Sequence, residues 1–225
     1  MSDIKLEPIV KTPSRNTADT AATKNVRGTR DGTLFTADWL TNLALQGRIY
    51  VCSDADQNDV VVGATSFATT TPTFLLDVPA GTAAIPLFVQ LVQAGSVAGA
   101  AIDVLIEFDN AARYTSGGTN ETTGLLSTRT DQPLSAKCKL YSTGGSAITA
   151  TDAYGTMLKH ILAIPQDVAP AITEVYNWHQ IEWHAPFPIL LVGPAAFLVY
   201  TYAGTTGPSW NWSVGWAELP SSDLT

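Results

Sequence analysis

The chain has 225 residues, of which 45% are hydrophobic and only 14% are charged, and its formal net charge is −8 at pH 7. This length lies within the range that β-sandwiches and barrels reach as one domain. The charged fraction is well below the roughly one quarter found in ordinary globular proteins. Charged groups are depleted from the centres of protein interfaces. We therefore expect one soluble domain, either a subunit enclosed by its neighbours or an ordinary β domain rich in small polar residues.

The charge is unevenly distributed along the chain. Residues 1–32 hold six basic and four acidic side chains, a net charge of +2, so the remainder carries −10. Affinity for nucleic acid comes mainly from Lys and Arg that neutralise phosphates. The acidic body therefore excludes tight binding of DNA or RNA by the folded part, and nucleic-acid contact is at most weak and made through the first 32 residues.

The same first 32 residues are poor in aromatic side chains and contain Pro8, Pro13 and Gly28. Such a segment cannot bury enough apolar surface to order on its own. We expect residues 1–32 to form a flexible N-terminal arm and residues 33–225 to form the domain.

A short helix is predicted directly after the arm. Thr36 or Asp38 can cap its beginning, and Gly47 can end it. The apolar residues that would share one helical face are Trp39, Leu40 and Leu43.

After Gly47 the pattern changes to short strand-like runs separated by turn residues. The clearest run is 101–108, in which apolar residues alternate with Asp103 and Glu107, so one face should be core and the other polar. Residues 157–164 fit either a strand or a helical turn. The predicted strands are 48–53, 59–67, 73–78, 85–93, 101–108, 136–141, 173–183, 188–192, 196–203 and 209–218.

About ten short strands, together with long turn-rich connections such as residues 110–133, are typical of two sheets that bury one face each. Alternating βαβ units and internal repeats are absent from the pattern. The sequence therefore predicts an all-β fold, a jelly-roll β-sandwich with one short helix and a flexible arm.

Three segments carry a resemblance to a known class of proteins. They read FLLDVPAGTAAIPLFVQLVQAGSVAGAAIDV (residues 74–104), PILLVGPAAFLVYTYAG (188–204) and SWNWSVGWAELP (209–220). Their pattern of strands and turns resembles that of viral single jelly-roll capsid and virion structural proteins, although they contain no diagnostic motif. The resemblance covers about residues 33–219 and implies a shell subunit whose arm runs along neighbouring subunits. The weakly basic arm departs from the many small capsids whose arms neutralise the genome directly.

Catalysis has little support in the sequence. A nucleophile needs a nearby base, and the chain offers only His160, His179 and His184. The glycine-rich segments 117–118 and 144–146 lack the strand-to-helix context or the Lys of a phosphate-binding loop, so we interpret both as turns. We expect no enzyme activity, no catalytic residues and no cofactor.

Two groups of residues in the sequence are candidate metal sites. Glu182 and His184 should point to the same side of one strand, with His179 nearby, but the set lacks the His-x-His of a cupin site. Asp54, Asp56 and Asn58 have the spacing that opens a calcium loop. An EF-hand is excluded because Asp59 replaces the turn glycine and Thr65 replaces the bidentate Glu. We expect no metal in the subunit, although a looser calcium site between subunits stays open.

Trp210, Trp212 and Trp216 lie on one face of the last strand. We interpret them as sandwich core, because aromatic side chains bury so much area. The alternative is an exposed face that stacks on sugars. The glycosylation patterns at residues 120–122 and 211–213 are interpreted as chance, because residues 1–10 show no secretory signal.

Two cysteines, Cys52 and Cys138, are too few for a disulfide framework and are interpreted as reduced core residues, with a disulfide as the alternative. The longest apolar stretch, residues 189–204, is too short for a membrane span and is interrupted by Gly193 and Pro194.

The sequence thus favours a capsid subunit that assembles with copies of itself and with other virion proteins into an icosahedral shell. We expect it to be made in the host cytoplasm and located in the virion. A carbohydrate- or receptor-binding β-sandwich module of a virion is the alternative.

Overall fold

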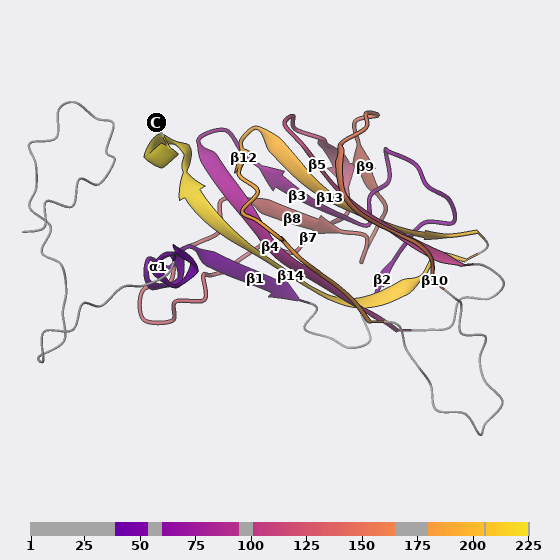
Figure 1. Cartoon of the computed structure of the whole chain (residues 1–225), viewed down its shortest axis with the longest axis horizontal. Coiled ribbons are helices and arrows are strands. Elements are labelled where there is room, and N and C mark those ends of the chain that lie inside the picture. The colour runs from indigo at the N-terminus through magenta and orange to yellow at the C-terminus, as the bar shows by residue number, and fades with distance from the viewer. Residues whose placement is uncertain (1–38, 54–59, 95–100, 165–179, 205, 225) are drawn as a thin grey trace, which may run out of the picture.

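The computed structural model describes residues 39–53, 60–94, 101–164, 180–204 and 206–224. The predicted arm, the helix caps at Thr36 and Asp38, and the calcium-like loop at residues 54–59 lie outside the described residues. Figure 1 shows two packed sheets with a short helix at one end.

The first sheet contains four strands in the order β1 (Ile49–Ser53), β14 (Ser209–Pro220), β4 (Thr82–Gln93) and β11 (Gln180–His184). Two short strands join it, β2 (Val61–Val62) on β14 and β12 (Leu191–Val192) on β4. The second sheet runs in the order β10 (Thr156–Ile164), β5 (Ile102–Asp109), β13 (Ala195–Ala203), β3 (Phe74–Val78), β8 (Lys139–Ser142) and β7 (Thr119–Asn120). A separate two-stranded sheet pairs β6 (Tyr114–Gly117) with β9 (Ile148–Ala150).

The long strands follow the order of a jelly roll. Eight strands form the sandwich, which in chain order are β1, β3, β4, β5, β10, β11, β13 and β14. The first sheet takes the first, eighth, third and sixth of them, and the second sheet takes the fifth, fourth, seventh and second, with every pair antiparallel. This interleaving is the double Greek key of a jelly roll. The predicted fold class is confirmed.

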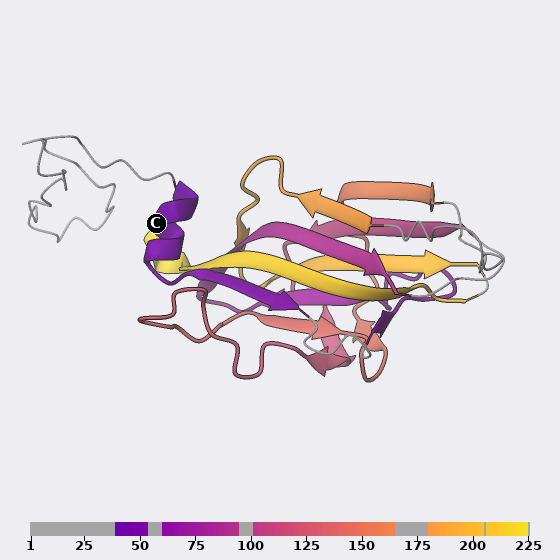
Figure 2. The ribbon, with the colours of Figure 1, turned by 90° about the horizontal axis from the view of Figure 1, so that it is seen from below.

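Helix α1 (Trp39–Leu45) forms where the sequence predicts it and ends at Gly47, whose φ of +69° suits glycine. The amide of Arg48 donates to the carbonyl of Leu43, and the amide of Gly47 donates to that of Ala44. Only Leu43 of the helix is buried, because the helix lies on the outer face of the first sheet and touches it along a narrow line. The short 3-10 helix η1 (Ser221–Leu224) lies at the same end of the sandwich in Figures 1 and 2.

Two predicted strands are much shorter than expected. The run 59–67 yields only β2, because the chain changes sheets at Gly63: Val61 and Val62 pair with β14, whereas Ala64 bridges to Tyr202 in the second sheet. A Cβ at Gly63 would lie 2.3 Å from the carbonyl oxygen of Thr201, so the crossing requires glycine. The run 188–192 yields only β12 because Pro188 has no amide hydrogen to donate. The ambiguous run 157–164 is a strand, β10.

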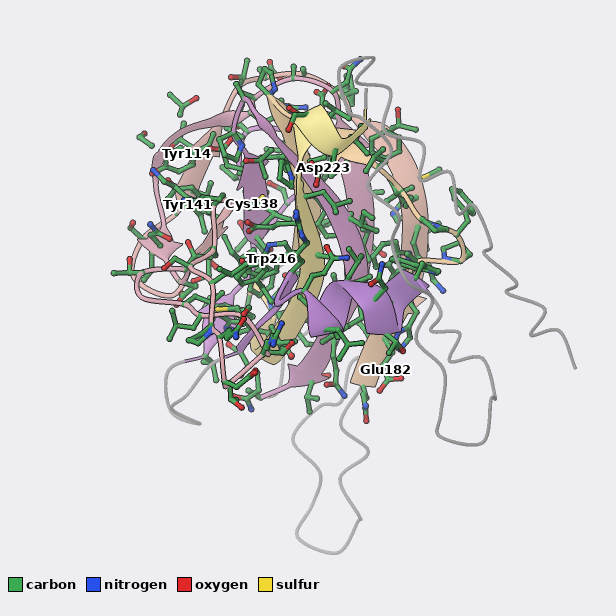
Figure 3. The ribbon with its side chains drawn as sticks, turned by 90° about the vertical axis from the view of Figure 1, so that its left-hand side faces the viewer. Tyr114, Cys138, Tyr141, Glu182, Trp216 and Asp223 are labelled. Atoms are coloured by element: carbon green, nitrogen blue, oxygen red, sulfur yellow. The ribbon has the colours of Figure 1, made fainter. Side chains whose placement is uncertain are left out.

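The main core lies between the two sheets and takes its largest side chains from β14. A second apolar cluster lies on the outer side of the second sheet. There Leu75, Leu198 and Tyr200 are covered by Tyr114 and Tyr141, whose rings stack with centroids 3.7 Å apart, and by β9. Figure 3 shows these two tyrosines together on one side of the sandwich, with Trp216 in its middle.

This cover comes from the connection between β5 and β10. Residues 110–133, expected to be a turn-rich connection, contain β6 and β7, whereas β8 overlaps the predicted strand 136–141 and β9 follows it. Glu107 lies on the face of β5 opposite the main core, as predicted, but this face is not open to solvent there: the connection folds over Glu107, which is only 4% exposed and accepts a hydrogen bond from the amide of Gly155 at 3.0 Å.

Candidate assembly surfaces

The three tryptophans of β14 belong to the core. Trp210 and Trp216 are fully buried, and Trp212 is 6% exposed. The ring of Trp216 stacks on Tyr50, and the ring of Trp212 packs against Phe74 of the second sheet. The interpretation as sandwich core is confirmed, and the alternative of a sugar-stacking face is wrong for these side chains, because no ligand can reach them.

Glu218 is the one acidic residue of β14, and its side chain points inward and links the two sheets. Its carboxylate accepts hydrogen bonds from Trp216 Nε1 at 2.9 Å and from the backbone amides of Lys137 and Cys138 at 2.8 and 3.0 Å. The side chain is buried, and burying a carboxylate is tolerated only when such donors surround it. Sequence analysis did not single out Glu218, although it shares the parity of Trp216, because glutamate is rarely fully buried.

Next to Glu218 lies an open groove of about 600 Å³ between the start of β1, the turn from β3 to β4 and residues 133–137. Two of its polar groups, Tyr50 and Glu218, are hydrogen-bonded within the fold. Tyr50 donates its hydroxyl to the carbonyl of Ser135, and burial together with Glu218 raises the pKa of the Tyr50 phenol to about 12. A neutral phenol beside a fully bonded carboxylate supplies neither a base nor a nucleophile at neutral pH. Tyr50 and Glu218 therefore give the groove neither a base nor a nucleophile.

Cys52 and Cys138 are both buried and unpaired, as predicted. Burial raises the pKa of Cys52 to about 12 and raises the pKa of Cys138 as well. The thiolate is the reactive form of cysteine. Both residues are therefore inert core side chains at neutral pH.

The proposed metal ligands Glu182 and His184 do share the outer face of β11, with 3.9 Å between His184 Nε2 and Glu182 Oε2. Glu182 Oε1 already accepts hydrogen bonds from Gln180 and Gln90. Within the described part of the chain, no three His, Cys, Asp or Glu side chains are grouped as a metal site would require. His179 lies outside the described residues.

The two glycosylation patterns begin at Asn120 and Asn211, and both asparagines are among the described residues. Asn120 Oδ1 accepts hydrogen bonds from the amide and the hydroxyl of Thr122, which closes a turn after β7. Asn211 stands on the outer face of β14, opposite Val92.

One outer face of the sandwich is closed by the chain itself. Arg113 is 1% exposed and bonds to Asp109 at the end of β5, to the carbonyl of Thr69, and to the carbonyls of Thr151 and Ala153 beyond β9. This guanidinium joins the connection between β5 and β10 to the second sheet. Sequence analysis missed it, because arginine is rarely buried and its partners are distant in the sequence.

Among the described residues, the other outer face, that of the first sheet, is covered by a helix only at one end. There Leu43 of α1 packs against Ile85 and Ala217. Beyond the helix the outward side chains of the four strands are apolar, hydroxyl or amide groups, with Glu182 and His184 at the β11 edge. We call this surface the bare face, and Figure 2 shows α1 at its one end.

Large apolar side chains are also exposed in two other regions. One group lies at the α1 end and on the connection near it, and the other lies along β10 and the segment from β11 to β12, at the upper edge in Figure 2. The first group is Trp39, Leu40, Leu45, Leu126 and Leu134, and the second is Met157, Leu162, Phe187, Leu190 and Val192, each between 39% and 64% exposed.

Comparison of the chain with family models, curated proteins and solved structures finds no match. The fold assignment therefore rests on the strand order alone. No helix among the described residues is long and apolar enough to cross a membrane.

Proposed function

We propose that the protein is a shell-forming structural subunit, a viral capsid protein, that assembles through contacts between copies of itself. The observation that carries the proposal is the presence of large exposed apolar side chains in two separate regions, the α1 end and the β10 edge. A module that binds one partner needs one such patch, whereas a subunit in a closed shell touches several neighbours.

The size of these side chains makes such contacts feasible. Fully burying one Leu, Met or Phe contributes about 1.5–3 kcal/mol. Association costs about 4–15 kcal/mol in translational and rotational freedom. Because these side chains are 39–64% exposed, burying the rest of each gives roughly half of that value, so five per region supply about 4–8 kcal/mol. This is of the order of the cost of association, and contacts of this moderate strength favour reversible assembly.

The fold is compatible with this role and with others, because jelly rolls serve in viral capsids, lectins and cupins. The lectin-like alternative loses its main support, since the tryptophans expected to stack on sugars are buried. A receptor- or carbohydrate-binding role would have to use another surface.

The arm of residues 1–32 would add contacts between subunits in this proposal. Its charge of only +2 implies that nucleic acid contributes little to assembly. Assembly should accordingly depend only weakly on salt, because a steep dependence arises when many phosphates are neutralised.

Sedimentation velocity of the full-length protein over a hundredfold concentration range tests the proposal. We expect species larger than dimers, and we expect the double variant Met157→Glu with Leu162→Glu to reduce them. Thr149→Glu, an exposed polar position on β9, controls for the added charge. A monomer at every concentration would overturn the proposal.

A further inference from the structure

The bare face differs from the rest of the surface in its chemistry. Its outward side chains form rows across the four strands, in the registers that pair β1, β14, β4 and β11. Its rows are Val51, Gly215, Phe88 and His184, then Ser53, Ser213, Gln90 and Glu182, and finally Asn211, Val92 and Gln180. These rows hold no Lys or Arg and one carboxylate, Glu182.

Gly215 keeps the middle of this face flat. A Cβ at this position would lie 2.2 Å from the ring of Phe88, so the ring lies directly over the glycine. The aromatic side chain is pressed onto the sheet instead of standing away from it. The surface beyond α1 is therefore low, whereas the helix is raised above the sheet at the other end.

We infer that the bare face is a two-fold contact between two copies of this chain. The inference rests on the proposed self-assembly and names one surface that carries it. In a two-fold contact residue i meets residue j and j meets i, so only the residues next to the axis meet their own copies. Hydroxyl and amide groups both donate and accept hydrogen bonds, so they can pair with their own copies, whereas carboxylates only accept.

The net charge of the folded part also favours a second copy of this chain as the partner on the bare face. The chain beyond residue 32 carries −10, so two copies repel each other over most of their surfaces. The rows of the bare face add little to that repulsion, because their one carboxylate, Glu182, lies at the sheet edge with two amide donors already on it.

Shape and area are also compatible with a pair of copies. A two-fold rotation places the raised α1 end of one copy against the low end of the other. The rows of the bare face span residues 211–215 of β14 and their partners on the other strands, which is roughly 320 Å² at about 3.3 Å per residue and about 4.8 Å per strand. A standard stable interface buries about 800 Å² on each partner, so the α1 end that this rotation places on each partner has to supply the rest.

A charge introduced near the two-fold axis lies close to the same charge on the second copy and repels it. This repulsion provides the test. In the full-length protein we expect Ser213→Arg to weaken dimerisation at least tenfold in sedimentation equilibrium. Thr115→Arg, on exposed β6, should leave it unchanged. Mixing Ser213→Arg with Ser213→Asp should restore the dimer as a heterodimer, and circular dichroism confirms that each variant is folded.

A photoreactive benzoylphenylalanine at Gln90 identifies the occupant directly. Cross-links to residues 85–93, 180–184 or 209–217 of a second copy support the inference. Cross-links to residues 1–38 or to any other surface overturn it, as does Ser213→Arg protein that dimerises normally. If the protein assembles while this contact fails, the proposed function stands without the inference, whereas a monomer at all concentrations removes both.

Discussion

Replacing Arg113 with Met removes the charge that joins the connection between β5 and β10 to the second sheet. The guanidinium lies 2.9 Å from Asp109 Oδ2 and donates to the carbonyls of Thr69, Thr151 and Ala153. The side chain is 1% exposed. Methionine fills much of the same volume but leaves the Asp109 carboxylate and these carbonyls without their donor.

The expected loss follows from the burial of the pair. Removing one partner of a buried ion pair typically costs about 3–5 kcal/mol. For a chain of 150–250 residues each kcal/mol lowers Tm by about 2–4 °C, so we expect a decrease of roughly 6–20 °C. Thermal unfolding followed by circular dichroism measures it, with variants at equal concentration because assembly also stabilises the folded state.

Arg129→Met is a matched control. Arg129 also lies 2.9 Å from an aspartate, Asp131, but the two side chains are 30% and 67% exposed, and the one further bond that Arg129 makes within the described residues is to the carbonyl of Leu45 at the end of α1. Exposed pairs contribute little, so its Tm should change by a small fraction of the Arg113→Met effect. Equal decreases for both variants, or an unchanged Tm for Arg113→Met, would refute the role assigned to burial.

Three further outcomes are expected. Because burial keeps Cys52 and Cys138 protonated, the folded protein should not react with a thiol reagent at pH 8. Unfolding in guanidinium should make both thiols reactive. Rapid reaction of the folded protein would contradict their burial. Gly215→Ala should destabilise the fold by about 1–3 kcal/mol in urea unfolding, and Phe88→Leu in the same chain should recover part of that loss; additive losses would show that the ring is not the obstacle. Deleting residues 1–30 should leave the far-ultraviolet spectrum unchanged but weaken or resize the assembly, so normal particles from the deletion would show that the arm has another role.

The sandwich strands could be predicted because their signal is local. Alternation along β5, β8 and β14 reflects the two sides of each strand, and the buried positions of Cys138, Leu140 and Trp216 follow from it. The same reasoning placed α1 correctly, since a glycine ends it.

The covered outer face could not be predicted for a physical reason. β6, β7 and β9 have two to four residues each, which is too short for a periodic signal. They are held by non-local partners such as Arg113 and the stacked rings of Tyr114 and Tyr141. The sequence therefore predicted neither the burial of Glu107 nor the difference between the two outer faces.

Electron microscopy of the purified full-length protein, concentrated without nucleic acid, tests the central claim most directly. The account predicts closed particles or curved sheets built from many copies. Fields containing only isolated subunits at the highest attainable concentration would contradict it.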